Sequence, residues 1–217
     1  MISEGVEEYL GAICKLSGEQ SPVAVSALAD RLRISSVSAN EMIKKLAQRG
    51  LVTYEPYKGV SLTAAGQAQA LRVIRRHRLW ERFLADVLGV PWDRVHEEAG
   101  RLEHATSPMV EGKLAQFLDE PQHCPHGYPV SGAEGGCRDE NTLPLSELKR
   151  GQRAVVLRVP EHDAELLGYI DELGLRPQTS LEVQEVAPFN GPLTIRVGEG
   201  RQVVGRHVAS QIIVQRA

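Results

Sequence analysis

RHRLWERFLADVLGVPWDRVHEEAGRLEHATSP, residues 76–108, is the stretch on which the organisation of this 217-residue chain depends. Two amphipathic helices joined by a Gly-Val-Pro turn are predicted here. They carry five side chains of the kinds that bind divalent metals: His77, Glu81, His96, Glu103 and His104. The first two share one helix face, and the other three fall within about 100° of arc on the second helix. Imidazole and carboxylate ligands together suit Mn²⁺, Fe²⁺, Zn²⁺ or Co²⁺, so the spacing favours a metal site over isolated core or surface histidines.

An apolar surface accompanies these candidate ligands. The two helices and the one that follows carry Leu79, Trp80, Phe83, Leu84, Val87, Leu88, Val95, Leu102, Met109, Val110, Leu114, Phe117 and Leu118. This surface is larger than a metal site needs. It predicts a helix-mediated homodimer, with a purely local core as the alternative.

The residues before this stretch predict a DNA-reading module. A helix with its apolar residues on one face is expected to begin near Val6. Two short helices are expected to follow, one over residues 25–34, capped near Ser26, and one over residues 36–49. Two such helices with a tight polar turn between them make a helix-turn-helix. The strand–turn–strand pattern of residues 51–63 then adds the wing of a winged helix.

The second short helix carries the groups expected to contact DNA. Its core-facing side chains are predicted to be Val37, Met42, Ile43 and Leu46. The polar groups suited to base edges and phosphates are Ser35, Ser36, Ser38, Asn40 and Glu41, and the expected phosphate contacts are Lys44, Lys45 and, in the wing, Lys58. Residues 1–76 hold ten Lys/Arg against seven Asp/Glu on a chain of net charge −3, which fits double-stranded DNA as the partner at this end. A winged helix used only for protein contacts is the alternative.

A loop and a run of short strands follow the central stretch. Cys124 and His126, one residue apart in a Pro-rich loop, add a thiolate and an imidazole as further candidate ligands. From residue 143 onward, five short strands with Gly/Pro turns and a helix over residues 165–173 predict a small β-barrel.

The composition indicates a cytoplasmic protein without a membrane partner. The sequence contains no run of about 18 apolar residues that would span a membrane. The acidic start MISEGVEEYL lacks the pattern of a signal peptide. Cys14, Cys124 and Cys137 are irregularly spaced, which favours thiols in a reducing compartment over a disulfide framework.

The order of these segments, with RRHRLWERFL at 75–84 and VHEEAGRLEHATS at 95–107, resembles the diphtheria toxin repressor family over the whole chain. The resemblance implies a mainly α fold with a small β part. It divides the chain into a winged helix-turn-helix domain (1–73), a helical metal-binding and dimerisation domain (74–142) and an SH3-like β-barrel (143–217). The last is similar to the ferrous-transport A protein.

The resemblance also implies a function. The chain is expected to be a regulator and not an enzyme, namely a homodimeric repressor of manganese or iron homeostasis genes that binds operator DNA when divalent metal is bound. A metal carrier and a metalloenzyme are the alternatives. The His/Glu set has the ligands to activate a water molecule, but the sequence has no HExxH motif and no obvious nucleophile.

Two metal sites in each subunit are implied by the resemblance. The expected ligands of the first are Glu8, His77, Glu103 and His104. Those of the second are Glu81 and His96 with ligands from the C-terminal domain, or Cys124 and His126 as in manganese-responsive relatives. Asp163, with Glu165 as the second choice, is expected to reach that site from the barrel.

One position departs from the family pattern. Gly100 stands where relatives often have a Cys or Glu ligand, so a site at this helix loses one ligand or recruits water. The oxygen donor of Glu8 favours Mn²⁺ over softer metals, with Fe²⁺ as the close alternative.

Overall fold

The computed structural model describes residues 3–18, 21–131 and 142–217. These residues form two compact units. The first contains the described residues of Met1–Trp80, Ala99–Gln122 and Pro129–Gly136, and the second those of Glu81–Glu98, His123–Tyr128 and Cys137–Ala217. Helices α4 (Ala64–Asp86) and α5 (Val95–Glu103) contribute residues to both units.

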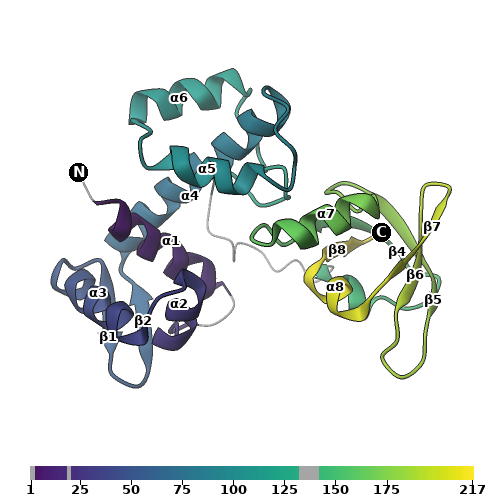
Figure 1. Cartoon of the computed structure of the whole chain (residues 1–217), viewed down its shortest axis with the longest axis horizontal. Helices are drawn as coiled ribbons and strands as arrows, with labels where there is room; N and C mark the ends of the chain where they lie inside the picture. The colour runs from purple at the N-terminus through teal and green to yellow at the C-terminus, as the bar shows by residue number, and fades with distance from the viewer. Residues whose placement is uncertain (1–2, 19–20, 132–141) are drawn as a thin grey trace. The chain divides into compact units, whose positions relative to one another are not determined.

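The first unit opens with a winged helix-turn-helix (Figure 1). Its elements are α1 (Glu4–Ser17), α2 (Val25–Leu32), α3 (Ser36–Gln48), β1 (Val52–Glu55) and β2 (Gly59–Leu62). The two strands pair antiparallel and form the wing. The helices bury their apolar faces on one another in a core that includes Leu10, Ile13, Leu28, Ile43, Leu46 and Val60, all with no measurable exposure.

Two details of this module differ from the predictions. Ala24 occupies the N-cap of α2 without a side-chain bond, so Ser26 is not its cap. Val37 is 70% exposed and does not join the core. At 100° per residue it lies about 180° around α3 from Leu46, so the two cannot face the same side.

The first unit also holds most of α4 and the helix α6 (Pro108–Phe117), whose first turn Ser107 caps by accepting a hydrogen bond from Val110 N. Gly66, near the start of α4, allows the helix to lie close to the backbone of Leu51. A Cβ built there would lie 1.9 Å from the carbonyl oxygen of Leu51.

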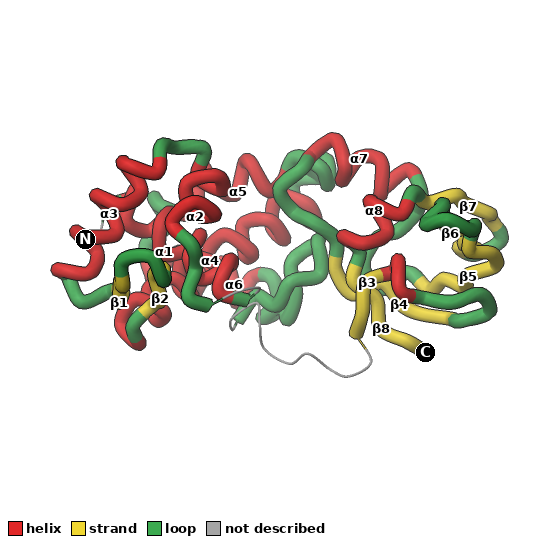
Figure 2. The backbone as a smooth tube through the Cα atoms, turned by 90° about the horizontal axis from the view of Figure 1, so that it is seen from below, coloured by secondary structure: helices red, strands yellow, loops and turns green. Residues whose placement is uncertain are grey.

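The second unit is built on a six-stranded antiparallel sheet of order β3-β8-β4-β5-β6-β7 (Figure 2). Its elements are β3 (Thr142–Pro144), a 3₁₀ turn (Leu145–Glu147), β4 (Arg153–Arg158), α7 (Ala164–Glu172), β5 (Ser180–Val186), β6 (Leu193–Val197), β7 (Gly200–Val204), α8 (Arg206–Gln211) and β8 (Ile213–Arg216). The five expected strands and α7 are present. The sequence reading missed β3, which is three residues long and contains a proline, and the short helix α8.

Buried side chains from α7 and the sheet form the core of this unit. Leu167 and Ile170 of α7 have no measurable exposure, and Trp92 from the segment before α5 belongs to the same cluster. In the described part of the chain, no helix is long and apolar enough to cross a membrane.

Candidate metal sites and nucleic-acid interface

In the first unit, a chain of hydrogen bonds joins His and Glu side chains from three helices. His77 Nδ1 on α4 lies 2.7 Å from Glu103 Oε2 at the end of α5. The other oxygen of Glu103 lies 3.1 Å from His104 Nε2. His104 Nδ1 in turn lies 2.7 Å from Glu7 Oε2 on α1. We call Glu7, His77, Glu103 and His104 the first cluster; it ties α1 of the DNA-reading module to the helices that follow.

Glu8, the residue expected from α1, lies beside this cluster. Ligand atoms of Glu4, Glu8 and His104 lie within 4.8 Å of one another. The sequence reading missed Glu7 and Glu4. The spacing of Glu4 and Glu8, four residues apart on one helix face, was the available signal for Glu4.

The first cluster shifts the pKa values of its members. Burial opposes ionisation of Glu103, but hydrogen bonds from His104 and His77 outweigh it and lower its pKa to about 2. The hydrogen bond to Glu103 is the main cause that raises the pKa of His104 to about 9, against burial and with help from Glu7. His104 is therefore protonated at neutral pH when no metal is bound.

This protonation predicts proton release on metal binding. A metal that takes a nitrogen of His104 must displace its proton at any pH below about 9. Apparent affinity should fall about tenfold for each pH unit below that value. Calorimetric titration with Mn²⁺ at pH 7.5 in buffers of different ionisation enthalpy should report about one released proton for the metal bound at the first cluster. Binding heats that do not depend on the buffer would contradict the assignment of His104.

The second unit brings together a different donor set. Ligand atoms of Glu81, Cys124, His126 and Glu161 lie within 4.8 Å of one another, and all four residues are buried. We call these four residues the second cluster. It contains two acids, a thiol and one imidazole. Since buried carboxylates need compensating positive charge, this donor set fits a divalent cation.

His126 is held with one nitrogen directed at the cluster. Its Nε2 lies 3.2 Å from the carbonyl oxygen of Trp92, which can only accept, so Nε2 carries the hydrogen. Its Nδ1 lies 3.4 Å from Glu81 Oε1. Burial opposes protonation of His126, but Glu81 outweighs it and the pKa of His126 is raised. The backbone of the segment before α5 thus orients this imidazole before any metal binds.

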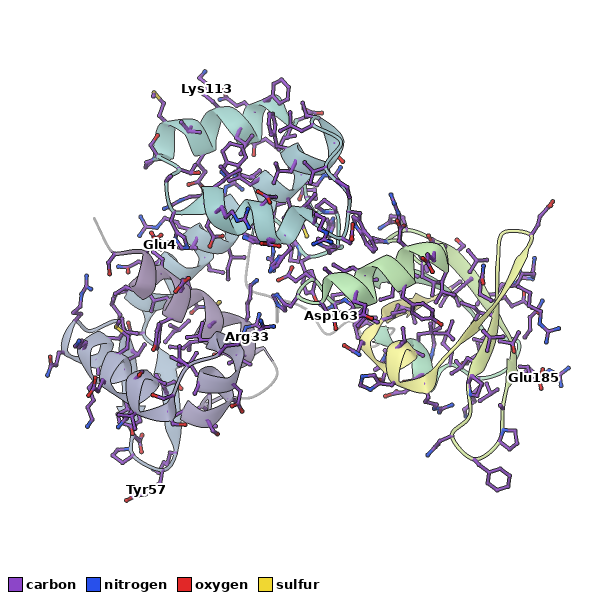
Figure 3. The ribbon with its side chains drawn as sticks, viewed as in Figure 1. Glu4, Arg33, Tyr57, Lys113, Asp163 and Glu185 are labelled. Carbon is purple, nitrogen blue, oxygen red and sulfur yellow. The ribbon has the colours of Figure 1, made fainter. Side chains whose placement is uncertain are left out.

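The two acids that were predicted to reach the second site from the barrel, Asp163 and Glu165, do not belong to the second cluster. Asp163 caps α7, accepting a hydrogen bond from Leu166 N at 3.0 Å, and is exposed at the start of that helix (Figure 3). Glu165 is exposed in the first turn of α7. Glu161, only 2% exposed and two residues before Asp163, is the acid that joins the second cluster. His96 lies beside the cluster, its Nδ1 2.8 Å from Glu81 Oε1.

The loop of the second cluster predicts a backbone-sensitive position. Gly127 has φ +92°, and a Cβ there would lie 1.9 Å from the carbonyl oxygen of Leu157. Gly127→Ala should therefore destabilise the protein by about 1–3 kcal/mol and displace Cys124 and His126. Urea unfolding with and without Mn²⁺ measures both effects. Gly112→Ala, where a Cβ meets nothing within 4 Å, is the control; equal unfolding midpoints for the two variants would refute this reading of the loop.

Gly100 lies within α5, and a Cβ at this position would meet nothing within 4 Å. The position that departs from the family pattern is therefore open space, not a packed glycine. The first side-chain carbon of any other residue fits there without a steric conflict.

The start of α3 presents the predicted DNA-contacting side chains. Ser36, Ser38, Glu41, Lys44 and Lys45 are exposed, and Asn40 is half-buried. Ser35 is used as the N-cap of α3, accepting a hydrogen bond from Ser38 N at 3.1 Å. The exposed Val37 adds an apolar group of the kind that contacts thymine methyls.

The wing carries the remaining predicted contact. Lys58 forms an ion pair with Glu55 at 2.6 Å. Tyr57 beside it is fully exposed at the tip of the β1–β2 hairpin (Figure 3). The sequence reading did not select Tyr57.

Comparison with known proteins places these features in one family. Residues 1–60 match the model of the iron-dependent repressor N-terminal DNA-binding domain, 63–131 that of its metal-binding and dimerisation domain, and 143–216 the FeoA domain. The iron-dependent repressor IdeR of Mycobacterium tuberculosis is 32% identical over 222 residues, covering 97% of this chain and 96% of the relative. The diphtheria toxin repressor of Corynebacterium jeikeium is 30% identical over 97% of this chain and 96% of its own length.

Solved structures agree with the sequence comparison. A manganese-dependent transcriptional repressor in complex with manganese has a TM-score of 0.86 and 32% identity, covering 98% of this chain and all of that one. The manganese regulator SloR has a TM-score of 0.77 and 31% identity, with 98% of each chain covered. The matching models are those of repressor domains and a FeoA domain, and the chain belongs to the diphtheria toxin repressor family of transcriptional regulators, which are not enzymes.

Proposed function

We propose that this chain is a metal-dependent DNA-binding repressor of manganese or iron homeostasis genes. It acts in the cytoplasm as a homodimer on operator DNA. One observation carries the proposal: Glu7 on α1 of the winged helix contacts His104, whose neighbour Glu103 contacts His77 on α4. A metal bound at this cluster would fix the DNA-reading module on the helices that follow it.

Two metal sites in each subunit are part of the proposal. The first is held by Glu8, His77, Glu103 and His104, with Glu4 and Glu7 adjacent. The second is held by Glu81, Cys124, His126 and Glu161. The oxygen and imidazole donors of the first site favour Mn²⁺, with Fe²⁺ as the alternative. The metal supplies positive charge and fixed geometry at both sites.

Metal binding at the first cluster would regulate DNA binding by shifting the protein's conformational population toward the operator-competent state. Without metal, Glu103 is held by two imidazoles and His104 by Glu7. With metal, the same side chains would turn to one cation and hold α1 in a single position relative to α4 and α5. Metal activates DNA binding only to the extent that it binds this operator-competent state more tightly than others.

An exposed apolar face supports the homodimer. Met109, Val110 and Phe117 on α6 are 75%, 42% and 66% exposed, and they line a surface pocket together with Leu114. This face lies within the domain that we propose for dimerisation, residues 74–142, between the DNA-reading domain (1–73) and the barrel (143–217). A two-fold dimer would present its two α3 helices to successive major grooves.

The DNA interface makes a separate prediction. Lys44→Ala should weaken binding to all duplexes alike and reduce the slope of log affinity against log salt by about 1. Val37→Ala should instead reduce discrimination between sequences, at about 1–3 kcal/mol for the base pair it contacts. Fluorescence anisotropy over a salt series measures both, with Lys149→Ala, an exposed lysine before β4, as the control. An unchanged salt slope for Lys44→Ala would remove that residue from the interface.

Selection from random-sequence duplexes tests the function itself. The full chain is incubated with the library in Mn²⁺, Fe²⁺ under anaerobic conditions, Zn²⁺ or a chelator. We expect enrichment of a two-fold-symmetric sequence with Mn²⁺ or Fe²⁺ and none with the chelator. Equal enrichment with the chelator would contradict the metal dependence of DNA binding. A lack of enrichment with every metal would favour the alternative function of a metal carrier.

A further inference from the structure

An arginine on α4 joins the first cluster to helix α6. Arg76 forms an ion pair with Glu7 of α1, with 3.7 Å between Arg76 Nη1 and Glu7 Oε1. On its other side, Arg76 Nε donates to Glu111 Oε2 on α6 at 3.2 Å. The side chains of the three residues are only 14–16% exposed, so water and salt screen these contacts less than they screen a surface ion pair. Arg76 and Glu111 have no role in the sites described above.

Further contacts fix the position of Arg76. Its Nη1 also donates to the backbone carbonyl oxygen of Glu103, at the end of α5, at 3.5 Å. The second carboxylate oxygen of Glu111 lies 3.4 Å from Arg75 Nε, and Arg75 in turn donates to Ser131 Oγ at 2.6 Å. A long side chain loses rotational freedom when it is ordered, and these neighbours hold Arg76 in one conformation.

Glu7 and Glu103 contact different nitrogens of His104. Glu7 Oε2 lies 2.7 Å from Nδ1, whereas Glu103 Oε1 lies 3.1 Å from Nε2. An ionised carboxylate can only accept, so the contact with Glu7 places a hydrogen on Nδ1. Because Glu103 is a proposed ligand, Nε2 is the nitrogen that faces the metal site. A carboxylate that holds the far nitrogen of a ligating imidazole fixes its tautomer and its orientation.

We propose that Arg76 is a positioning residue of the first metal site. Anchored on α6 by Glu111, it holds Glu7 against His104 Nδ1 and so keeps His104 Nε2 directed at the metal. Glu7 is then also a positioning residue and not a ligand. The inference rests on the proposed first site but not on DNA binding. Through these contacts the metal affinity depends on α6, the helix that carries the exposed apolar face.

A ligand role for Glu7 makes the opposite prediction. If Glu7 bound the metal, Arg76 would compete for its carboxylate, and a weaker contact with Arg76 would raise the metal affinity. In the proposed role, a weaker contact lowers it. The test needs a substitution that keeps the charge, because loss of a positive charge beside the site raises cation affinity by itself. Arg76→Lys keeps the charge, but an ammonium lacks the planar fork that holds two carboxylates.

The experiment titrates the full-length chain with Mn²⁺ in the absence of DNA and measures free Mn²⁺ by electron paramagnetic resonance. The first site is the Mn²⁺ equivalent that Glu103→Gln loses. Arg76→Lys should bind this equivalent about tenfold more weakly than wild type. Arg72→Lys, the same substitution at an exposed position of α4, should match wild type. In a Glu7→Gln background, Arg76→Lys should have no further effect, because the carboxylate through which it acts is gone.

The tautomer of His104 gives a second readout. With Zn²⁺ as a diamagnetic probe, long-range proton–nitrogen NMR correlations report which ring nitrogen carries the hydrogen. His104 should keep its hydrogen on Nδ1 and bind Zn²⁺ through Nε2. This measurement uses the wild-type protein, so it does not depend on the folding of a variant.

Three results would overturn the role of Arg76. They are an unchanged or higher Mn²⁺ affinity in Arg76→Lys, additive effects of Arg76→Lys and Glu7→Gln, and Zn²⁺ on Nδ1 of His104. Each leaves the first site standing if Glu103→Gln still loses its Mn²⁺ equivalent. A Glu103→Gln variant that loses none would refute the first site and the role of Arg76 together. Failure of the proposed DNA-binding function appears only in the duplex selection.

Discussion

Glu103→Gln is expected to abolish the activation of DNA binding by metal, a loss of about a hundredfold in affinity at fixed Mn²⁺. Glu103 contacts His77 and His104 with its two oxygens, at 2.7 and 3.1 Å. An amide has no negative charge for a cation, and its NH₂ group would face an imidazole that now donates toward it. Anisotropy with the selected duplex, titrated with Mn²⁺, measures the change.

The matched control is Glu97→Gln, the same substitution at an exposed position on the same helix. It should retain the response of the wild type. Circular dichroism should show both variants folded. A folded Glu103→Gln variant with a normal Mn²⁺ response would remove Glu103 from the first site.

His126→Ala is expected to cause the largest loss of stability, about 3–5 kcal/mol without metal. His126 and Glu81 both have no measurable exposure, so truncation removes from a buried carboxylate one of the imidazoles that compensate its charge. It also removes the ring that packs against Trp92 at 5.3 Å between centroids. Urea unfolding followed by tryptophan fluorescence, in chelator, measures the change.

A second comparison separates stability from metal binding. His123→Ala, an exposed histidine of the same loop, should unfold like the wild type. Cys124→Ala should change the free energy of unfolding little without metal, but the variant should lose the added stability that Mn²⁺ gives the wild type. A His126→Ala variant within about 1 kcal/mol of the wild type would contradict the charge argument for this cluster.

Local periodicity was enough to predict the helices and to place the candidate ligands that lie on them. His77 and Glu103 sit on helices whose apolar spacing defines the buried face, so their direction followed from their position in the sequence. The same reasoning failed at Val37. This residue is apolar, but its angular position on α3 places it opposite Leu46, and it is 70% exposed.

Ligands from loops could not be predicted in the same way. Asp163 was preferred because an acid was expected before α7, but its carboxylate caps that helix. Glu161 and His162 take their directions from the irregular segment between β4 and α7, where no helical or strand period fixes the side chains. Their approach to Cys124 and His96 depends on tertiary packing between segments more than thirty residues apart in the sequence.

The central claim is that metal and operator DNA bind to the same state of the protein, and thermodynamic reciprocity tests it directly. The Mn²⁺ affinity of the full chain is measured with and without the selected duplex, and the duplex affinity with and without Mn²⁺. Our account predicts that each ligand raises the affinity of the other by the same factor, within the range of about 5–150-fold. A Mn²⁺ affinity that does not change when operator DNA is present would contradict it.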